Sequence, residues 1–181
     1  MKVVEEGGLD IEEEDGKHQS PLRLAASFGH VEVVKYLISK NAVVDKANDA
    51  GETALFIAAS KGFPLVVELL AQNGSSLEVK DKTGTTPLLV SCDAGYPMVT
   101  RFLLSKGCDV NSKSGTGRSC LIRAAQYGHL GVVEVLLEHN AQVDVRDNEG
   151  RSALLYAASR NYIEGTNTIS QYTTSMHFLL Y

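Results

Sequence analysis

The chain has 181 residues, of which 44% are hydrophobic and 22% charged, and it carries a formal net charge of −5. No apolar run approaches the roughly 18 residues that a membrane-spanning helix needs, and the acidic start does not resemble a signal peptide. Three cysteines are an odd, low number that fits free thiols, so we expect a cytoplasmic protein, with the nucleus as the alternative. The acidic balance, without a basic stripe interleaved with aromatic residues, argues against a nucleic-acid partner.

A period of 33 residues organises the chain, and it is set by five leucines: Leu22, Leu55, Leu88, Leu121 and Leu154. Glycines recur at the same step in two columns, and a Ser or Thr stands two residues before each leucine. Such a repeat indicates a solenoid, in which each unit is too small to bury its own apolar face and packs on its neighbours. We therefore expect one elongated domain without a linker.

Residues 1–18 hold either a partial N-terminal repeat or an acidic cap. One period before Tyr36 lies Val3, and one period before Val44 lies Ile11, which is the pattern expected for the end of an earlier second helix and its tail. On that interpretation the chain is a piece of a longer array. The alternative is a native polar cap, and residues 1–15 carry seven acids against one lysine, a net charge of −6.

Residues 19–150 are predicted to form four full units with two helices each. A short apolar segment such as residues 54–59 ends at a glycine, and a longer amphipathic segment such as residues 64–70 follows. Pro64 and Pro97 mark the first position of second helices, where proline is tolerated. Polar turns such as residues 147–150 join the units. Because no long run alternates with period two, an all-α fold is expected.

Residues 151–181 are predicted to be a degenerate fifth repeat and a C-terminal tail. The first helix begins well after Ser152, but Gly165 and Thr166 then occupy positions that hold apolar residues in other units. The Ser- and Thr-rich segment that follows is poor material for a second helix. We interpret it as a diverged cap or a truncated repeat, and the apolar end, residues 176–181, does not decide between them.

The repeated unit resembles the ankyrin repeat. Its opening reads Thr86-Pro87-Leu88, second helices carry Val-Val and Leu-Leu pairs such as residues 132–133 and 136–137, and a tail reads Gly-Cys-Asp-Val-Asn at residues 107–111. The resemblance extends from residue 2 to about residue 162 and implies a solenoid of stacked helix pairs joined by β-hairpin-like turns. The histidine of the family motif is replaced in every unit, by Arg23, Phe56, Leu89, Ile122 and Leu155. In the last four of these units the replacing residue is apolar, and we expect apolar contacts there instead of the hydrogen bonds of the histidine.

The resemblance places the partner-binding surface on the hairpin tips and the ends of the first helices. The charged residues mapped there are eight cations and four acids, a net +4 in a chain of −5. Lys80, Lys113 and Arg146 share one column and are expected to form a ridge that attracts an acidic partner, with Tyr127 and Phe28 as aromatic anchors. The alternative is a solvated face whose charges only keep the array soluble. The candidate binding residues are Phe28, Asp49, Glu52, Lys61, Lys80, Lys82, Asp93, Lys113, Arg118, Gln126, Tyr127, Arg146, Glu149, Arg151 and Arg160.

Catalytic and metal sites are not predicted. Cys92, Cys108 and Cys120 occupy slots that other units fill with small residues, and no Cys or His residues converge at the spacing of a zinc site. No glycine-rich phosphate loop follows a strand, so neither an enzyme activity nor a cofactor is expected. Asn111 lies in a context that asparagine hydroxylases accept in ankyrin repeats, although a role as a turn cap, as for Asp45, is the simpler interpretation.

The function predicted from these patterns is that of a non-catalytic protein–protein interaction module, a scaffold or adaptor. We expect a monomer that binds a protein with an acidic segment on its hairpin tips and first-helix face. The alternative is a recognition domain of a larger enzyme or of a ubiquitin-ligase substrate receptor, of which this chain is a fragment. A purely structural spacer is a third possibility.

Overall fold

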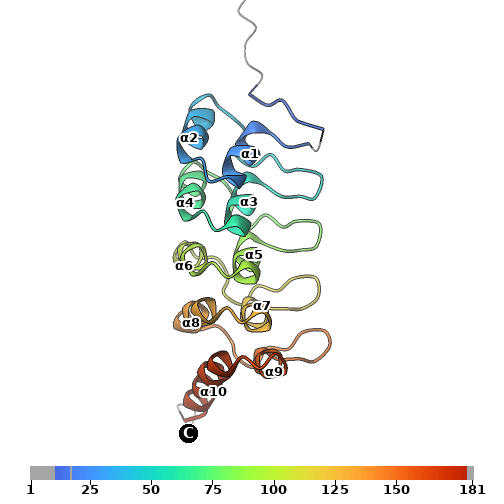
Figure 1. Cartoon of the computed structure of the whole chain (residues 1–181), viewed down its shortest axis with the longest axis vertical. Coiled ribbons are helices and arrows are strands. Elements are labelled where there is room, and N and C mark those ends of the chain that lie inside the picture. Colours follow the sequence, from blue (N-terminus) through green and yellow to red (C-terminus); the bar gives the residue numbers. More distant parts are fainter. Residues whose placement is uncertain (1–10, 17, 179–181) are drawn as a thin grey trace, which may run out of the picture.

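The structure, a computed structural model, describes residues 11–16 and 18–178, with side chains described to residue 172. In that part of the chain ten helices form five consecutive pairs (Figure 1). First helices pack on first helices and second helices on second helices, so the stack has two layers, with the hairpins projecting from the first-helix side. The helices are α1 Pro21–Ser27, α2 Val31–Ser39, α3 Ala54–Lys61, α4 Pro64–Gln72, α5 Pro87–Ala94, α6 Pro97–Ser105, α7 Cys120–Tyr127, α8 Leu130–Glu138, α9 Ala153–Ser159 and α10 Ile163–Phe178.

This arrangement confirms the predicted all-α solenoid. The described residues contain no strand, and the hairpins carry only isolated β-bridges, between Lys113 and Ser119 and between Arg146 and Ser152. Pro64 and Pro97 stand at the first turn of α4 and α6, as predicted. Among the described helices, none combines the length and the apolar character that crossing a bilayer requires.

The hydroxyl column caps the first helices. In every unit the Ser or Thr side chain accepts a hydrogen bond from the backbone N–H three residues later, which satisfies one of the free donors at the helix start. Thr86, for example, accepts from the N–H of Leu89 at 3.2 Å. The cap fixes where each helix begins, and the leucine two residues later therefore points into the stack.

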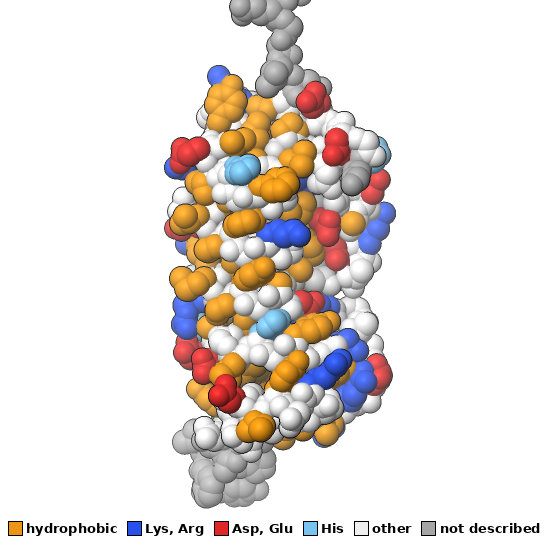
Figure 2. Space-filling model, viewed as in Figure 1, with side chains coloured by type: hydrophobic (Ala, Val, Ile, Leu, Met, Phe, Trp, Pro, Cys, Tyr) orange, Lys and Arg blue, Asp and Glu red, His pale blue; other side chains and the backbone are white. Residues whose placement is uncertain are grey.

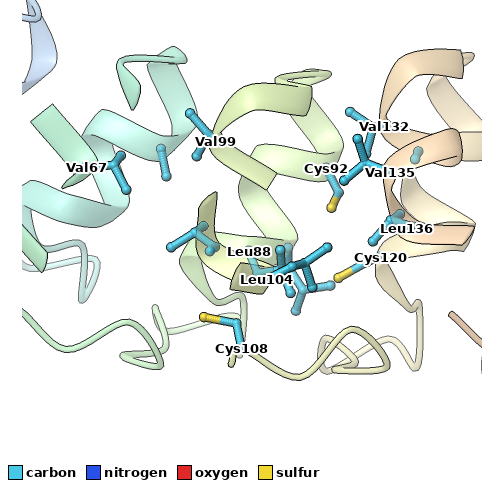
Figure 3. Packing of buried hydrophobic residues seen from close by; sticks show 14 of the residues in the cluster. Val67, Leu88, Cys92, Val99, Leu104, Cys108, Cys120, Val132, Val135 and Leu136 are labelled. Atoms are coloured by element: carbon cyan, nitrogen blue, oxygen red, sulfur yellow. The ribbon is translucent and has the colours of Figure 1, made fainter. Parts of the chain in front are cut away.

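The leucine column lies at the centre of one continuous core. Leu55, Leu88 and Leu121 are at most 1% exposed, and each is buried by residues of its own unit and of its neighbours. Figure 3 shows Cys92 and Cys120 in the same packing, among aliphatic side chains such as Val132 and Leu136. Because the core lies between units, every unit depends on the adjacent units for its burial.

The glycine that ends a first helix meets two requirements at once. Gly62 has a φ of 75°, in the left-handed region that favours glycine. The ring of Tyr96, from the next unit, lies so close that a Cβ on Gly62 would overlap it. Phe63, His129 and Tyr162 cover the corresponding glycines of the other units in the same way, so a row of rings runs along the stack.

The position of the missing family histidine behaves as predicted in only part of the array. Phe56, Leu89 and Ile122 are buried, as expected, but Leu155 is 52% exposed. The prediction for Leu155 was wrong because, within the residues described, no further unit packs against α9. Arg23 is 1% exposed and donates hydrogen bonds to the carbonyl oxygens of Lys46, at 2.8 Å, and of His18.

The described part of residues 1–18 follows the geometry of the later hairpins. Asp15 Oδ1 accepts the N–H of Gln19 at 2.9 Å, as Asp81 Oδ1 accepts the N–H of Thr85 at 2.8 Å. Ile11 packs on the core, in the register predicted for it. Val3, which was also part of that prediction, lies outside the described residues. The partial-repeat interpretation of residues 1–18 stays a prediction.

The segment after Ile163 forms α10, so the expectation of poor second-helix material was wrong there. Ile169 is fully buried and lies one period after Leu136, in the apolar column of the second helices. Thr166 and Thr168 turn their hydroxyls back onto carbonyl oxygens one helical turn earlier, at 2.8 and 2.9 Å. Packing at Ile169 therefore outweighs the low helix propensity of the segment.

Candidate partner-binding surface

The candidate residues all lie on the hairpin side of the stack or at the ends of the first helices. Phe28 follows α1, Lys61, Gln126 and Tyr127 lie in the last turns of α3 and α7, and the remaining candidates lie in the hairpins or at the corresponding ends of α5 and α9. Figure 1 shows the hairpins and the first helices following one another along one side of the stack. The structure thus places the mapped residues along one side of the array.

The hairpin tips are held in place by their own side chains. Asp81 Oδ1 accepts N–H groups from Thr83 and Thr85, both at 2.8 Å, and Asn48 and Asp147 make the same turn in their units. Successive hairpins are also joined by backbone hydrogen bonds, such as that from Lys82 N to the oxygen of Ala50 at 2.9 Å. The tips therefore form a continuous, ordered ribbon rather than independent loops.

The predicted basic ridge lies on this ribbon at equivalent positions of three hairpins. Lys80, Lys113 and Arg146 are exposed, and Arg146 donates to the carbonyl oxygen of Gly150 at 2.7 Å. Within the described residues, no carboxylate forms an ion pair with these three side chains, nor with Lys82 or Arg160. Their charge is therefore available to a partner.

Charge is distributed unevenly along the stack. Figure 2 shows Lys and Arg side chains gathered near the last hairpins, whereas Asp and Glu side chains predominate along the hairpin side nearer the start. At that start Lys46 Nζ pairs with Glu12 at 3.3 Å and with Glu14 at 3.1 Å. The hydrogen bond from Lys46 lowers the pKa of Glu14, and the same contact raises the pKa of Lys46. The first hairpin is thus acidic, and its carboxylates pair with a lysine of the second hairpin. The cations without ion pairs lie mainly farther along the stack.

Two of the mapped cations belong to a cluster in the last two units. Arg118 and Arg151 both lie over the ring of Tyr156, with guanidinium carbons 5.4 and 4.7 Å from the ring centroid. Both contact Asp147, whose side chain is 1% exposed, and both contact Glu149. The charge count from the sequence was therefore too simple, because these two arginines are partly neutralised and Asp147 was not in the mapped set.

Asp147 is an ionised group inside this cluster. Burial opposes its ionisation, but hydrogen bonds from the N–H of Arg151, the hydroxyl of Tyr156 and the N–H of Glu149 outweigh that effect and hold its pKa at about 2. The Tyr156 hydroxyl donates to Asp147 Oδ2 at 2.8 Å. At neutral pH the cluster therefore contains a fixed negative charge beneath two fixed positive charges.

A second ion pair crosses between the units of α5 and α7. Arg123 donates to Asp93 Oδ2, and burial raises the pKa of Asp93 although the guanidinium of Arg123 counteracts the shift. Sequence mapping identified Asp93 but missed Arg123. The side-chain oxygen of Gln126 is buried with no hydrogen-bond partner among the described residues.

The two aromatic candidates are exposed and each pairs with a histidine. Phe28 is 64% exposed and stacks on His30 with ring centroids 5.8 Å apart. Tyr127 is 50% exposed and lies 6.0 Å from the ring of His129, whose Nε2 lies 2.8 Å from the carbonyl oxygen of Asp93. Both rings are therefore supported and accessible, as an anchor for a partner requires.

The three cysteines lie inside the core, and two of them, Cys108 and Cys120, are held protonated at neutral pH. Burial and the nearby Glu78 carboxylate raise the pKa of Cys108 to about 12, and a hydrogen bond with Cys92 together with burial raises the pKa of Cys120. A thiol, unlike a thiolate, is a poor nucleophile and metal ligand. No group of three or more His, Cys, Asp or Glu residues in the described chain is arranged to hold a metal ion.

Asn111 makes the turn contact that its column predicts. Its Oδ1 accepts the N–H of Gln142, in the next unit, at 2.9 Å, as Asp45 Oδ2 accepts the N–H of Ser76 at 3.0 Å. These contacts favour a structural role for Asn111. Its hydroxylation stays a prediction.

Comparison with known proteins bears on the family of this chain. A family model described as ankyrin repeats (three copies) matches residues 3–81, 22–114 and 88–176. Ankyrin repeat domain-containing protein 13B from Mus musculus and from Homo sapiens are each 39% identical to this chain over 54 residues, which is 30% of this chain and 9% of each relative. The chain thus matches only a small part of these curated relatives. Because the family model covers nearly the whole chain, this protein belongs to the ankyrin repeat family.

Proposed function

We propose that this chain is a non-catalytic binding module, a scaffold or adaptor, whose partner brings an acidic segment to its last three hairpins. Ankyrin repeats are generally protein–protein interaction modules. The proposal of an acidic partner is supported by a row of three cations on the hairpins, Lys80, Lys113 and Arg146. These side chains are exposed and have no ion pair among the described residues. A surface with one sign of charge attracts and orients the opposite sign.

The proposed contact area extends from the hairpin tips to the ends of α7 and α9. Tyr127, at the end of α7, offers a ring that is 50% exposed, and aromatic residues carry more binding energy than charges at an interface edge. A standard interface of about 800 Å² per partner fits such a face. We place the protein in the cytoplasm, with the nucleus as the alternative, since its thiols are free and buried. We also propose that it acts as a monomer.

The test removes the charges of the ridge and compares the effect on partner binding with that of removing the same number of charges from the second-helix layer. One variant changes three ridge residues together to Gln: Lys80, Lys113 and Arg146. The control variant makes the same change to Gln at three exposed cations of the second-helix side: Lys35, Lys40 and Lys106. Proteins captured from a lysate by the parent chain are measured for affinity against both variants, after thermal unfolding has shown equal stability. The proposal requires that an acidic partner bind the parent and the control but bind the ridge variant weakly. Equal loss in both variants would show that only net charge matters.

A second candidate is a recognition domain within a larger enzyme or ubiquitin-ligase substrate receptor. The matched segment is only 9% of each curated relative, so similar repeats occur inside much longer chains. Sequencing of the transcript tests this candidate, because it requires coding sequence that continues on at least one side.

A further inference from the structure

The last two hairpins and α9 bring together five charged or aromatic side chains, some of which depart from the repeat: Arg118, Asp147, Glu149, Arg151 and Tyr156. One period earlier, Thr116 stands in place of Glu149, Ser114 in place of Asp147 and Arg123 in place of Tyr156. The five side chains of this cluster contact one another across two neighbouring units. We name these five residues the arginine cluster. Arg118 and Arg151 share one column of the repeat, and Asp81 stands two periods before Asp147, but Glu149 and Tyr156 have no counterpart of the same chemistry in their columns.

The base of the arginine cluster is rigid. Asp147 is held by the turn N–H groups of Glu149 and Arg151, at 3.0 and 2.9 Å, and by the hydroxyl of Tyr156 at 2.8 Å. Both guanidinium groups lie over the buried Tyr156 ring, which restricts their movement. Two positive charges are thus fixed in position before any ligand arrives.

Arg118 has unused hydrogen-bonding capacity. Its guanidinium lies 3.6 Å from Asp147 Oδ2 and 3.7 Å from Glu149 Oε1, longer than the 2.7–2.9 Å of a charge-assisted hydrogen bond. Its Nε is buried facing Asp147 and has no hydrogen-bond acceptor among the described residues, so the capacity open to a ligand is that of the terminal nitrogens, on the side of the exposed Glu149. A guanidinium normally donates to a carboxylate as a two-pronged fork, so Arg118 is poised to take a further acceptor.

The carboxylate of Glu149 lies on the solvent side of Arg118 and Arg151 and can move away from them. Its Oε1 contacts both Arg118 and Arg151, yet the side chain is 63% exposed. The turn depends on the backbone N–H of Glu149 and not on its side chain, because Asp147 accepts that N–H. The carboxylate can therefore rotate into water while the hairpin keeps its shape.

We propose that Arg118 and Arg151 bind one carboxylate side chain of an acidic peptide partner, and that Glu149 holds that place in the absence of the partner. This inference rests on the proposed function, and it specifies where the acidic segment docks and which residue competes with it. Binding exchanges one exposed ion pair for another, so Glu149 lowers the affinity without preventing binding. Removing the competing carboxylate should tighten binding about two- to fivefold, the range expected for an exposed ion pair.

The experiment uses the full chain and a fluorescently labelled oligoglutamate peptide at low ionic strength, where screening is weak. Glu149→Gln is compared with Glu134→Gln, which makes the same change of charge on the exposed surface of α8, in the other layer. We expect Glu149→Gln to tighten binding and Glu134→Gln to leave it near the parent value. In a chain that already carries Arg118→Gln and Arg151→Gln, Glu149→Gln should have no effect.

Site-specific NMR adds a readout that a change of net charge would not move. The guanidinium N–H signals of Arg118 and Arg151 should shift when oligoglutamate is added, whereas that of Arg101, which pairs with Glu138 on the second-helix side, should not. Equal effects of the two Gln variants, or weaker binding by Glu149→Gln, would overturn this inference. If binding still depended on Lys80, Lys113 and Arg146, the proposed function would stand without it. If the parent chain did not bind oligoglutamate at all, both would fall.

Discussion

Gly62→Ala tests how tightly the ring row, formed by Phe63, Tyr96, His129 and Tyr162 over the glycines of the preceding units, packs on those glycines. The measured quantity is the free energy of unfolding. An alanine there adopts a φ of 75°, which costs about 1–2 kcal/mol, and its Cβ overlaps the Tyr96 ring. Moving a packed ring costs about 1–3 kcal/mol more. The expected loss of unfolding free energy is therefore about 2–5 kcal/mol.

Gly74→Ala supplies the matched control. Gly74 has a φ of 88°, but no heavy atom lies within 4 Å of a Cβ built there. Urea denaturation should give about 1–2 kcal/mol for this backbone change alone. Tyr96→Ala in the Gly62→Ala chain should recover part of the extra loss, as a double-mutant cycle requires. Equal losses for the two glycine variants would refute the argument that the ring contact constrains this position.

Three further predictions concern stability and thiol chemistry. Leu121→Ala, at a side chain that is 1% exposed, should lower the unfolding free energy by about 3–5 kcal/mol, while Leu65→Ala, which is 65% exposed, should change it by less than about 0.5 kcal/mol in the same urea titrations. The pKa of Asp147 is about 2 in the folded chain against an ordinary 3.8, so the unfolded state takes up the proton first as the pH falls. The stabilisation from the ionised Asp147 is therefore complete above about pH 5 and is lost as the pH falls towards 2. Acid titration of Asp147→Asn should accordingly show a shallower loss of unfolding free energy than the parent chain. A thiol reagent at neutral pH should label none of the three buried cysteines until urea unfolds the chain, and fast labelling of the native protein would contradict their burial.

The fold was predictable because the residues that specify it act locally and recur. A capping hydroxyl such as Thr86, a core leucine such as Leu88 and a left-handed glycine such as Gly95 each need only their own few neighbours to define a helix boundary. The ring row was not predicted, since His129 and Tyr96 differ in chemistry and share only a place above the preceding glycine. The helix after Ile163 was missed for a related reason: its stability comes from packing and not from propensity.

Only part of the candidate binding surface could be predicted from the sequence by the same reasoning. Mapping by position found the exposed cations, because Lys80 and Lys113 stand at repeated points of the hairpins. It missed Asp147, Tyr156 and Arg123, which lie at positions that the mapping did not include. A signal was nevertheless present in the sequence: Tyr156 stands in a column that holds Ile57 and Val90 in earlier units, and a change of chemistry within a column marks a local role.

The uneven charge of the array gives the proposed partner a direction as well as a location. At the first hairpin Glu12 and Glu14 already pair with Lys46, so an acidic segment finds few available cations there and is repelled by Asp49. At the last hairpins the same segment meets Arg146 and the arginine cluster. Because the helix pairs form one stack with joined hairpins, these two environments keep a fixed separation. An acidic segment bound to this surface should therefore lie towards the C-terminal units, leaving Phe28 to contact an apolar part of the same partner.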